Sequence, residues 1–399
     1  MTSPGASKAA SAAREAVASA PRDPNAPVRV LLLHNRYRDA GGEERVVDEL
    51  EALLAGRGHA VGRLERDSEA AGRAQAARGL LRGGLDPGDV AAAVRLHHAD
   101  VVHAHNLHPL LGWRALAAAR AAGARTVLHL HNYRLVCAIG VAYRDGEPCY
   151  LCRGRDTRPG LRHRCRASRA EGIAYAAGLA RQQPQLLAHA DALVSVSEAL
   201  AARLAELGIP RERMTVVPNA AGAIAPDSRA ADGTYALVAG RLVEEKGFDV
   251  AVRAARDAGV PLRVAGTGPA EARLRALAAS AGVTFLGRLS AAALARERRG
   301  AAVLLAPSRN DDPCPMTVVE ALADGLPVLG SARGGIPELI GDGATLPPDD
   351  PAAWCGALSA LWSDPARRAA AGADALARAR ARHSPDAWYA GLLGVYGGA

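Results

Sequence analysis

Short apolar runs alternate with helical patterns along most of the chain, and this alternation is the feature that most limits the possible folds. In the first half, the predicted strands are residues 28–34, 60–64, 100–103, 126–130, 192–196 and 214–217. In the second half, they are residues 235–239, 262–265, 283–286, 301–306 and 327–329. Helical patterns such as residues 43–56 and 197–207 separate several of them. Strands that alternate with helices form parallel sheets covered by helices, so we predict an α/β protein.

The two series of strands predict two doubly wound, Rossmann-like domains that face each other across a cleft. The first domain covers residues 28–218 and the second covers residues 234–384, with a weakly patterned linker at residues 219–233. A length of 399 residues, of which 49% are hydrophobic and 23% charged, is enough for two cores. Residues 1–27 are rich in Ala, Ser and Pro, and we predict a disordered tail there.

Targeting signals and net charge indicate where the chain works and what it binds. Arg14 and Glu15 interrupt the Ala-rich part of the tail, so it lacks the apolar core of a signal peptide. No segment approaches the roughly 18 apolar residues of a membrane span, and we expect a cytoplasmic protein that can contact the inner face of the membrane. A net charge of +8 favours anionic partners. Aromatic residues make up 4% of the chain, too few for base-stacking platforms, so we expect no nucleic acid partner.

Two carboxylates follow one predicted strand of the second domain. The strand at residues 301–306 opens into the segment PSRNDDPCPMTVVE, residues 307–320, which holds Asp312 in a loop and Glu320 in a helix. Ligands bind at the carboxyl ends of strands in open α/β sheets, so this pair can hold two parts of a polyhydroxylated ligand. As isolated residues, they could equally be a turn former and a solvated helix residue. A glycine-rich turn with Gly334 and Gly335 precedes another helix, where exposed amides suit an anion.

Three other loops at strand ends carry candidate phosphate-binding groups. Gly41 and Gly42 precede the first helix of the first domain, and Arg241 and Lys246 share the loop after the first strand of the second domain. Cations there can neutralise a diphosphate. The turn Gly266-Thr267-Gly268-Pro269 is a further candidate, although it lacks the third glycine of a dinucleotide fingerprint.

Histidines lie at the ends of two strands of the first domain. In the strand at residues 126–130, alternation puts His129 on the same face as His131, which lies where the strand reaches the cleft. We interpret His129 as structural. His103 and His105 end the preceding strand, and we assign them to the wall of the cleft.

These segments together resemble the family-4 retaining glycosyltransferases, which belong to the glycosyl transferases group 1 and have the GT-B fold. The resemblance covers about residues 28–396. Asp312 and Glu320 stand at the spacing of the family's Glu-x7-Glu mark, Gly240 to Gly247 match its G-R-L-x-x-x-K-G motif, and Gly266 to Pro269 match its G-x-G-P turn. His131 matches the histidine of its His-Asp motif, with Asn132 in place of the aspartate.

The resemblance implies a hexosyltransferase that moves a sugar from a nucleotide diphosphate sugar to a hydroxyl acceptor with retention. The acceptor would be a cell-envelope polysaccharide, a glycolipid or a small polyol, and no cofactor would be required. A helix in residues 385–399 would cross back to the first domain. The residues implied in donor binding or catalysis are Gly41, Gly42, His131, Arg241, Lys246, Gly266, Gly268, Asp312, Cys314, Pro315, Met316, Thr317 and Glu320. A catalytically weak sugar-nucleotide-binding protein or a GT-B epimerase stays open, because Asp312 and Asn132 depart from the family pattern.

An insertion at residues 137–168 concentrates cysteine and arginine. Cys137, Cys149, Cys152 and Cys165 form the pattern C-x11-C-x2-C-x12-C, which allows a structural zinc site, reduced packed thiols or a redox pair. The arginines of the insertion, among them Arg162, Arg164 and Arg166, form either a solvated face or a docking site for an anionic or lipid-linked acceptor or a membrane surface.

Overall fold

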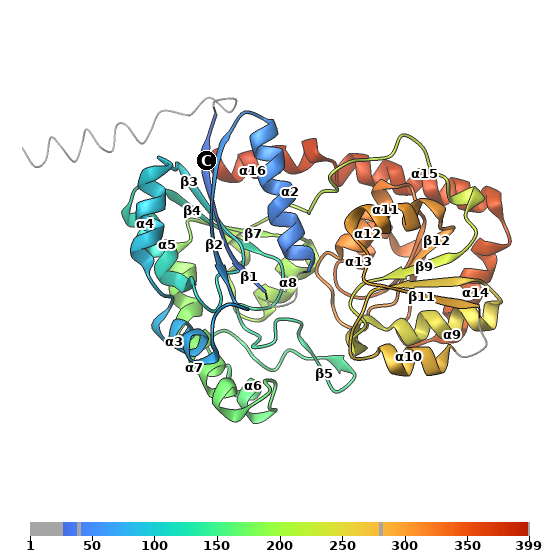
Figure 1. The fold of residues 1–399 in the computed structure, drawn as a ribbon, viewed down its shortest axis with the longest axis horizontal. Coiled ribbons are helices and arrows are strands. Elements are labelled where there is room, and N and C mark those ends of the chain that lie inside the picture. Colours follow the sequence, from blue (N-terminus) through green and yellow to red (C-terminus); the bar gives the residue numbers. More distant parts are fainter. Residues whose placement is uncertain (1–26, 38–40, 279–281, 398–399) are drawn as a thin grey trace, which may run out of the picture.

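The computed structural model describes residues 27–37, 41–278 and 282–397. It has two lobes, each built on a six-stranded parallel sheet (Figure 1). The strand orders are β2-β1-β3-β4-β7-β8 and β11-β10-β9-β12-β13-β14. The second order corresponds to 3-2-1-4-5-6, the doubly wound order that places a ligand crevice between its first and fourth strands, here β9 and β12. The predicted two-domain α/β fold is confirmed.

The first domain is an apolar sheet covered by helices on both faces. Its strands are β1 (Arg29–Arg36), β2 (Ala60–Asp67), β3 (Val101–Ala104), β4 (Arg125–Leu130), β7 (Ala192–Ser195) and β8 (Met214–Val216). Its helices are α2 (Gly42–Gly56), α3 (Arg73–Arg82), α4 (Pro87–Leu96), α5 (Gly112–Ala121), α7 (Arg169–His189) and α8 (Glu198–Glu206), with the 3₁₀ helix η1 (Arg211–Arg213). The interior residues of β1 are all buried, as a central parallel strand requires.

The insertion lies between β4 and α7 and has little regular structure of its own. It contains a two-stranded antiparallel ribbon, β5 (Tyr143–Arg144) with β6 (Glu147–Pro148), and the short helix α6 (Arg158–Arg162). Helix α6 packs on α7, and β5 reaches toward the second lobe (Figure 1).

The second domain repeats the doubly wound plan with shorter strands. Its strands are β9 (Ala236–Ala239), β10 (Leu262–Ala265), β11 (Val283–Gly287), β12 (Val303–Ala306), β13 (Val328–Ser331) and β14 (Thr345–Leu346). Its helices are α9 (Phe248–Ala258), α10 (Glu271–Leu277), α11 (Ala291–Gly300), α12 (Met316–Ala323), α13 (Ile336–Ile340), α14 (Pro351–Trp362) and α15 (Pro365–Arg382). The 3₁₀ helices are η2 (Ala230–Asp232), η3 (Glu244–Lys246) and η4 (Asp342–Ala344).

The last helix, α16 (Pro385–Gly397), leaves the second domain and packs on the first (Figure 1). Trp388, Leu392 and Tyr396 are buried in one core cluster with Val30 and Leu50 of β1 and α2. The Tyr396 hydroxyl lies 2.6 Å from Nδ1 of His103, so a polar contact also ties this helix to the core.

Most predicted strands occur within two residues of their predicted ends. The exception is β2, which ends three residues after its predicted end. The three strands of two residues each, β5, β6 and β14, were not predicted, because such short runs carry no periodicity. The predicted tail, except for Pro27, lies outside the described residues. Among the described helices, none combines the length and the apolarity that crossing a bilayer demands.

Candidate active site

A cleft of about 1570 Å³ lies between the two domains, at the carboxyl ends of strands from both sheets. Its lining includes every residue that the sequence analysis implied in donor binding or catalysis, with the exception of Gly268. The backbone of Gly268 packs behind the lining, since a Cβ on it would come within 2.5 Å of the Leu242 carbonyl.

Backbone hydrogen bonds connect the loop after β9 to the loop after β12, and these two loops form the centre of the cleft. Arg309 and Asn310 donate their amides to the Glu245 carbonyl, at 2.8 and 3.3 Å. Gly247 has a φ of +64° and lies so close to Pro307 that a Cβ would come within 1.9 Å of its carbonyl oxygen. Only glycine fits there, because the conformation is left-handed and the space is filled.

This backbone contact brings Lys246 to Asp312. The Lys246 ammonium forms an ion pair with the Asp312 carboxylate, and both groups line the cleft. Asp312 is only 8% exposed. Arg241, from the same loop as Lys246, is exposed and extends into the cleft. Two cations therefore lie at one end of the cleft, where they can interact with a diphosphate.

Glu320 lies on the buried face of α12 and contacts arginines from both domains. Arg45 of α2 approaches one carboxylate oxygen at 2.7 Å, and Arg298 of α11 binds the other. Burial raises the pKa of Glu320, and the two guanidinium groups oppose that rise. A carboxylate oxygen can accept more than one hydrogen bond, so Glu320 can still accept from a ligand hydroxyl.

The start of α12 faces the cleft between these two groups. The amides of Met316 and Thr317 belong to the first turn, where a helix supplies no internal acceptor and its dipole favours an anion. Across the cleft, a Cβ on Gly42 would lie 3.3 Å from Cγ of Met316, so α2 and α12 meet at this glycine. Burial raises the pKa of the neighbouring Cys314 to about 12, which keeps its thiol neutral.

The glycines after β13 and β10 support these loops, and their role differs from the predicted one. The Gly335 amide donates to the Asp312 carbonyl at 2.8 Å, and the Gly266 amide donates to the Gly287 carbonyl at 2.7 Å. Because both amides already bind the backbone, they are not available to an anion. The nearby Glu338 accepts hydrogen bonds from the amides of Glu198 and Ala199, which ties the second domain to the start of α8.

His131 and its neighbours form a stack of imidazole rings beneath the cleft. The rings of His129 and His131 stack with centroids 4.1 Å apart, and Nδ1 of His105 lies 2.9 Å from Nε2 of His131. Burial, followed by the effect of neighbouring histidines, lowers the pKa of His131 to about 3. The ring is therefore neutral at physiological pH. Within this stack of described rings, His131 lines the cleft and His103 and His105 do not. The assignment of His103 and His105 to the cleft wall was therefore wrong: they are 0% and 2% exposed.

Beside His131, other polar groups of the first domain also line the cleft. Glu44 accepts hydrogen bonds from the amides of Tyr37 and Gly41, at 2.9 and 2.8 Å. These bonds and the contact with His34 lower the pKa of Glu44 to about 2 against the effect of burial. Asn132, which stands where the family motif has an aspartate, donates to Glu43 at 3.2 Å and so joins the polar network that lines the cleft.

Several of these groups were missed by the sequence analysis. Arg45 and Arg298, the partners of Glu320, carry no local signal, since each is one of many arginines on a helix. Tyr37 and Glu43 flank the Gly41-Gly42 loop, and their position could have indicated a role. Lys246, which was predicted, carries a further signal that was not used: Lys8 and Lys246 are the only lysines in the sequence, and all other residues of its Lys and Arg total are arginines.

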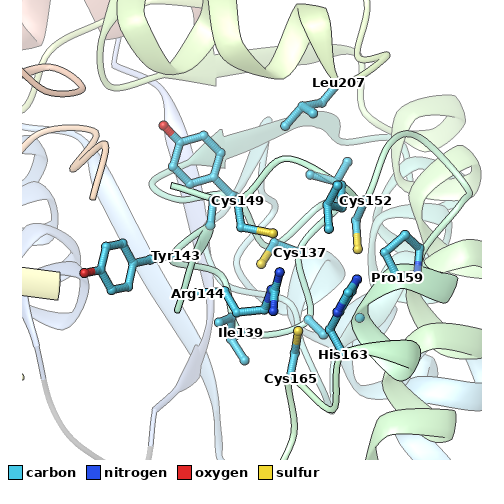
Figure 2. Close-up of a pocket in the computed structure, with 16 residues that line it drawn as sticks. Cys137, Ile139, Tyr143, Arg144, Cys149, Cys152, Pro159, His163, Cys165 and Leu207 are labelled. Carbon is cyan, nitrogen blue, oxygen red and sulfur yellow. The ribbon is translucent and has the colours of Figure 1, made fainter. Parts of the chain in front are cut away.

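The four cysteines of the insertion line a separate small cavity, shown in Figure 2. Cys137, Cys149, Cys152 and Cys165 are free thiols, and the cavity volume is about 20 Å³. Burial raises the pKa of Cys152 to about 11, so this thiol is not a nucleophile at neutral pH.

Comparison with known proteins links both domains to one class of enzyme. Residues 40–221 match the family model Glycosyltransferase Family 4, and residues 233–364 match the family model Glycosyl transferases group 1. The chain is 30% identical over 174 residues to the glycosyltransferase WcaL of Escherichia coli (strain K12), covering 39% of this chain and 43% of that protein. It is 34% identical over 229 residues to D-inositol 3-phosphate glycosyltransferase of Nocardia farcinica, covering 49% and 50%. The chain thus spans about half the length of the curated relatives it matches.

Solved structures share the fold over nearly the whole chain. Sucrose-phosphate synthase from Thermosynechococcus elongatus has a TM-score of 0.62 at 19% identity, with 92% of this chain and 98% of that chain covered. Anabaena HepE in complex with UDP-glucose has a TM-score of 0.60 at 17% identity, with 92% and 98% covered.

Proposed function

Since the chain belongs to the group 1 glycosyltransferases of family 4, we propose that it transfers a hexose from a nucleoside diphosphate sugar to a hydroxyl acceptor. The observation that carries the proposal is the convergence of Lys246, Asp312 and Glu320 in one cleft with the start of α12. Cations, a helix start and a ribose-binding carboxylate are what a nucleoside diphosphate needs.

The proposed reaction proceeds with retention of configuration and without a covalent enzyme intermediate. The bond between the sugar and the diphosphate breaks in an oxocarbenium-like transition state, and the acceptor hydroxyl attacks on the face that the diphosphate leaves. Arg241 and Lys246 stabilise the negative charge that develops on the diphosphate. Glu320 holds the ribose, and Asp312, His131 and the amides at the start of α12 orient the sugar.

The ion pair of Lys246 with Asp312 gives this mechanism a specific feature. When a diphosphate arrives, it offers Lys246 a second anionic partner, and Asp312 can then accept a hydrogen bond from a sugar hydroxyl. A lysine suits this exchange because its ammonium is a compact charge with three rotatable donors, whereas a guanidinium prefers a fixed fork.

The direct test is the turnover of Lys246 variants. Lys246→Ala should lower kcat by about 10²-fold, the size of effect seen when a charge-stabilising group is removed. Lys246→Arg should recover only part of this loss because of the altered geometry. Arg378→Ala is a matched control, since it removes a cation that pairs with Asp374 on α15, outside the cleft. Equal turnover of Lys246→Ala and the control would remove Lys246 from the mechanism.

The donor is proposed to be a uridine diphosphate hexose, because solved relatives of the same fold carry UDP or UDP-glucose. Binding of a ligand at about 100 times its Kd adds about 2.7 kcal/mol to the free energy of unfolding. Thermal unfolding with UDP-, GDP- and ADP-glucose should therefore show a raised Tm with the uridine series alone. A shift with another base would reassign the donor, and no shift with any would contradict the proposed donor site.

A second function, sugar-nucleotide binding or epimerisation without transfer, is favoured by one observation: Asp312 is shorter than the usual glutamate of the family motif. The two functions differ in product. Transfer releases nucleoside diphosphate in proportion to acceptor, while epimerisation changes the donor sugar with no acceptor present.

The proposed acceptor is anionic or presented at an anionic membrane surface, and it is a cell-envelope polysaccharide, a glycolipid or a small polyol. Helices α6 and α7 pack together. Arg162 at the end of α6, Arg164 in the link between the helices and Arg169 at the start of α7 are exposed, and Ile173 of α7 is 55% exposed. Arg166 is not part of this surface, because it pairs with Glu171.

Vesicle binding tests this surface. Reversing the charge of Arg162, Arg164 and Arg169 should weaken binding to anionic vesicles by about 10²-fold, at about 1 kcal/mol per arginine. Unchanged binding, or equal binding of the native protein to neutral vesicles, would refute the membrane role.

A further inference from the structure

The insertion between β4 and α7 has too little structure of its own to explain its defined path. Within residues 131–168, the regular elements are two strands of two residues and one helix of five residues. Its first part packs into the core of the first domain through Tyr133, Leu135, Val136 and Ala142, whereas residues 149–168 place no buried side chain in a hydrophobic core cluster. This second part needs another source of stability, for which small protein modules use disulfides or metal ions.

All four cysteines of the insertion face one enclosed space. Cys137 follows the turn after Tyr133, Cys149 and Cys152 follow the β5-β6 ribbon, and Cys165 precedes α7. Their side chains surround the same cavity, which holds about 20 Å³ (Figure 2). That volume accommodates a single atom-sized guest such as a water molecule or a metal ion.

The rest of the cavity lining favours a metal ion over water. Val136, Ala138, Ala142, Leu151 and Leu207 supply an apolar wall. A water molecule needs two to four polar partners, whereas thiols bond weakly to water and strongly to a soft metal ion. A shell of four sulfur ligands with an apolar surround is the donor set of a closed structural zinc site.

We propose that Cys137, Cys149, Cys152 and Cys165 bind one Zn²⁺ ion that holds the insertion together. Among the described residues, a group of three ligand atoms within 4.8 Å of one another occurs at the histidine stack and not at these thiols. Binding would therefore draw the four sulfur atoms inward. The cavity between the four side chains leaves space for this movement.

The charges around the cavity suit the same ion. Zn²⁺ with four thiolates carries a net charge of −2, and burial of that charge requires cations or N–H donors close to sulfur. Arg144 lines the cavity, and Figure 2 shows its guanidinium among the sulfur atoms. His163 also lines the cavity, and it provides a second polar group beside the proposed ligands.

The zinc site would also position a contact between the two domains. Tyr150, which lies between Cys149 and Cys152, donates its hydroxyl to the Asp311 carboxylate, and the Tyr133 hydroxyl donates to the Asp311 carbonyl at 3.1 Å. Asp311 precedes Asp312, the partner of Lys246. On the proposed function of the cleft, loss of zinc should therefore raise the KM for the donor.

The test starts with metal analysis of the full chain, purified without chelator and without a histidine tag. We expect about one zinc per chain, as in closed four-ligand sites. Cys152→Ser should lose most of it, while Cys355→Ser, which changes a cysteine on α14, should keep it. His163→Asn should also keep it, because the ligands are the four cysteines. Loss of zinc from His163→Asn would overturn this ligand set.

A second measurement covers the case in which Cys152→Ser does not fold. Cobalt(II) exchanged into the native protein should give the absorption bands of a tetrahedral tetrathiolate site, and a mercurial that titrates the thiols should release the metal. Zinc-free protein that takes up no cobalt would overturn the proposal. So would iron with sulfide, or disulfides among the four cysteines found by mass spectrometry. Because these readouts do not involve sugar transfer, they hold or fail independently of the proposed enzyme activity.

Discussion

Acidification should destabilise this protein through three buried histidines of the first domain. His103, His105 and His129 are at most 2% exposed, and they stack with ring centroids 4.6 to 5.3 Å apart. Burial lowers the pKa of His103 to about 3 and the pKa values of the other two well below 6.5. The Tyr396 hydroxyl and the rings of His131 and His34 are the polar groups that face them. None of these groups carries a negative charge.

The expected loss follows from the difference between the native and unfolded pKa values. Unfolded histidines bind a proton near pH 6.5, so below that pH the unfolded state takes up protons that the native state does not. Stability is therefore complete above pH 6.5 and declines on acidification. From about pH 7.5 to about pH 5.5, each ring contributes a loss of about 1.4 kcal/mol, and the three rings together about 4 kcal/mol.

The assay is urea unfolding, followed by circular dichroism, of the native protein and of His129→Leu. The variant lacks one of the three rings, so its loss between the two pH values should be smaller by about 1.4 kcal/mol. Buried carboxyl groups with raised pKa values, such as Glu43 and Glu320, act in the opposite direction, but they are common to both proteins and cancel in the difference.

His98→Asn is the matched control. His98 is exposed and lies outside the stack, and its φ of +47° is a conformation that asparagine tolerates. His98→Asn should therefore leave the three buried rings, and the acid sensitivity that they cause, in place. If His129→Leu has the same pH dependence as the native protein, the buried rings are not the source of the acid sensitivity, and the reasoning fails.

Two further predictions concern the cleft. Gly247→Ala should destabilise the protein by about 2–5 kcal/mol in thermal melts and lower turnover, because it combines backbone strain with overpacking against Pro307. Gly259→Ala is the control. Gly259 has a similar φ, and a Cβ there would have no atom within 4 Å, so this change should destabilise the protein by only about 1–2 kcal/mol. Equal losses would show that the contact between the two loops is unimportant. Arg45→Met removes a cation 2.7 Å from Glu320, which should raise the pKa of that carboxyl further and move the acid limb of the kcat/KM profile to higher pH. An acid limb that stays in place would contradict a role for ionised Glu320.

The two-domain plan could be predicted from the sequence because strands and helices differ in period. Strand β10 begins and ends at its predicted residues, and Glu320 lies on a helix, α12, as predicted. The loops at the strand ends could also be found, since parallel strands bring their carboxyl ends to one edge of a sheet. The position of Arg241, Lys246, Asp312 and Glu320 in one cleft follows from that rule.

The contacts between the loops at the strand ends could not be predicted from periodicity. The Gly335 amide looked suitable for an anion and instead binds the Asp312 carbonyl, and His105 looked like a cleft residue and is buried beneath it. Both differences arise from packing between segments that are far apart in the chain, and a local sequence pattern carries no information about such packing.

By itself, the amino-acid sequence determined the class of fold, the edge of each sheet that binds a ligand and the residue types present there, because these depend on local periodicity and on chain order. The tertiary structure alone decided the partners. It set Lys246 on Asp312 and placed Arg45 and Arg298 on Glu320. Ion pairs and burial depend on distances between residues that are remote in sequence. The folding of the second domain sets the pairs of Lys246 with Asp312 and of Arg298 with Glu320, and the packing of the two domains brings Arg45 to Glu320.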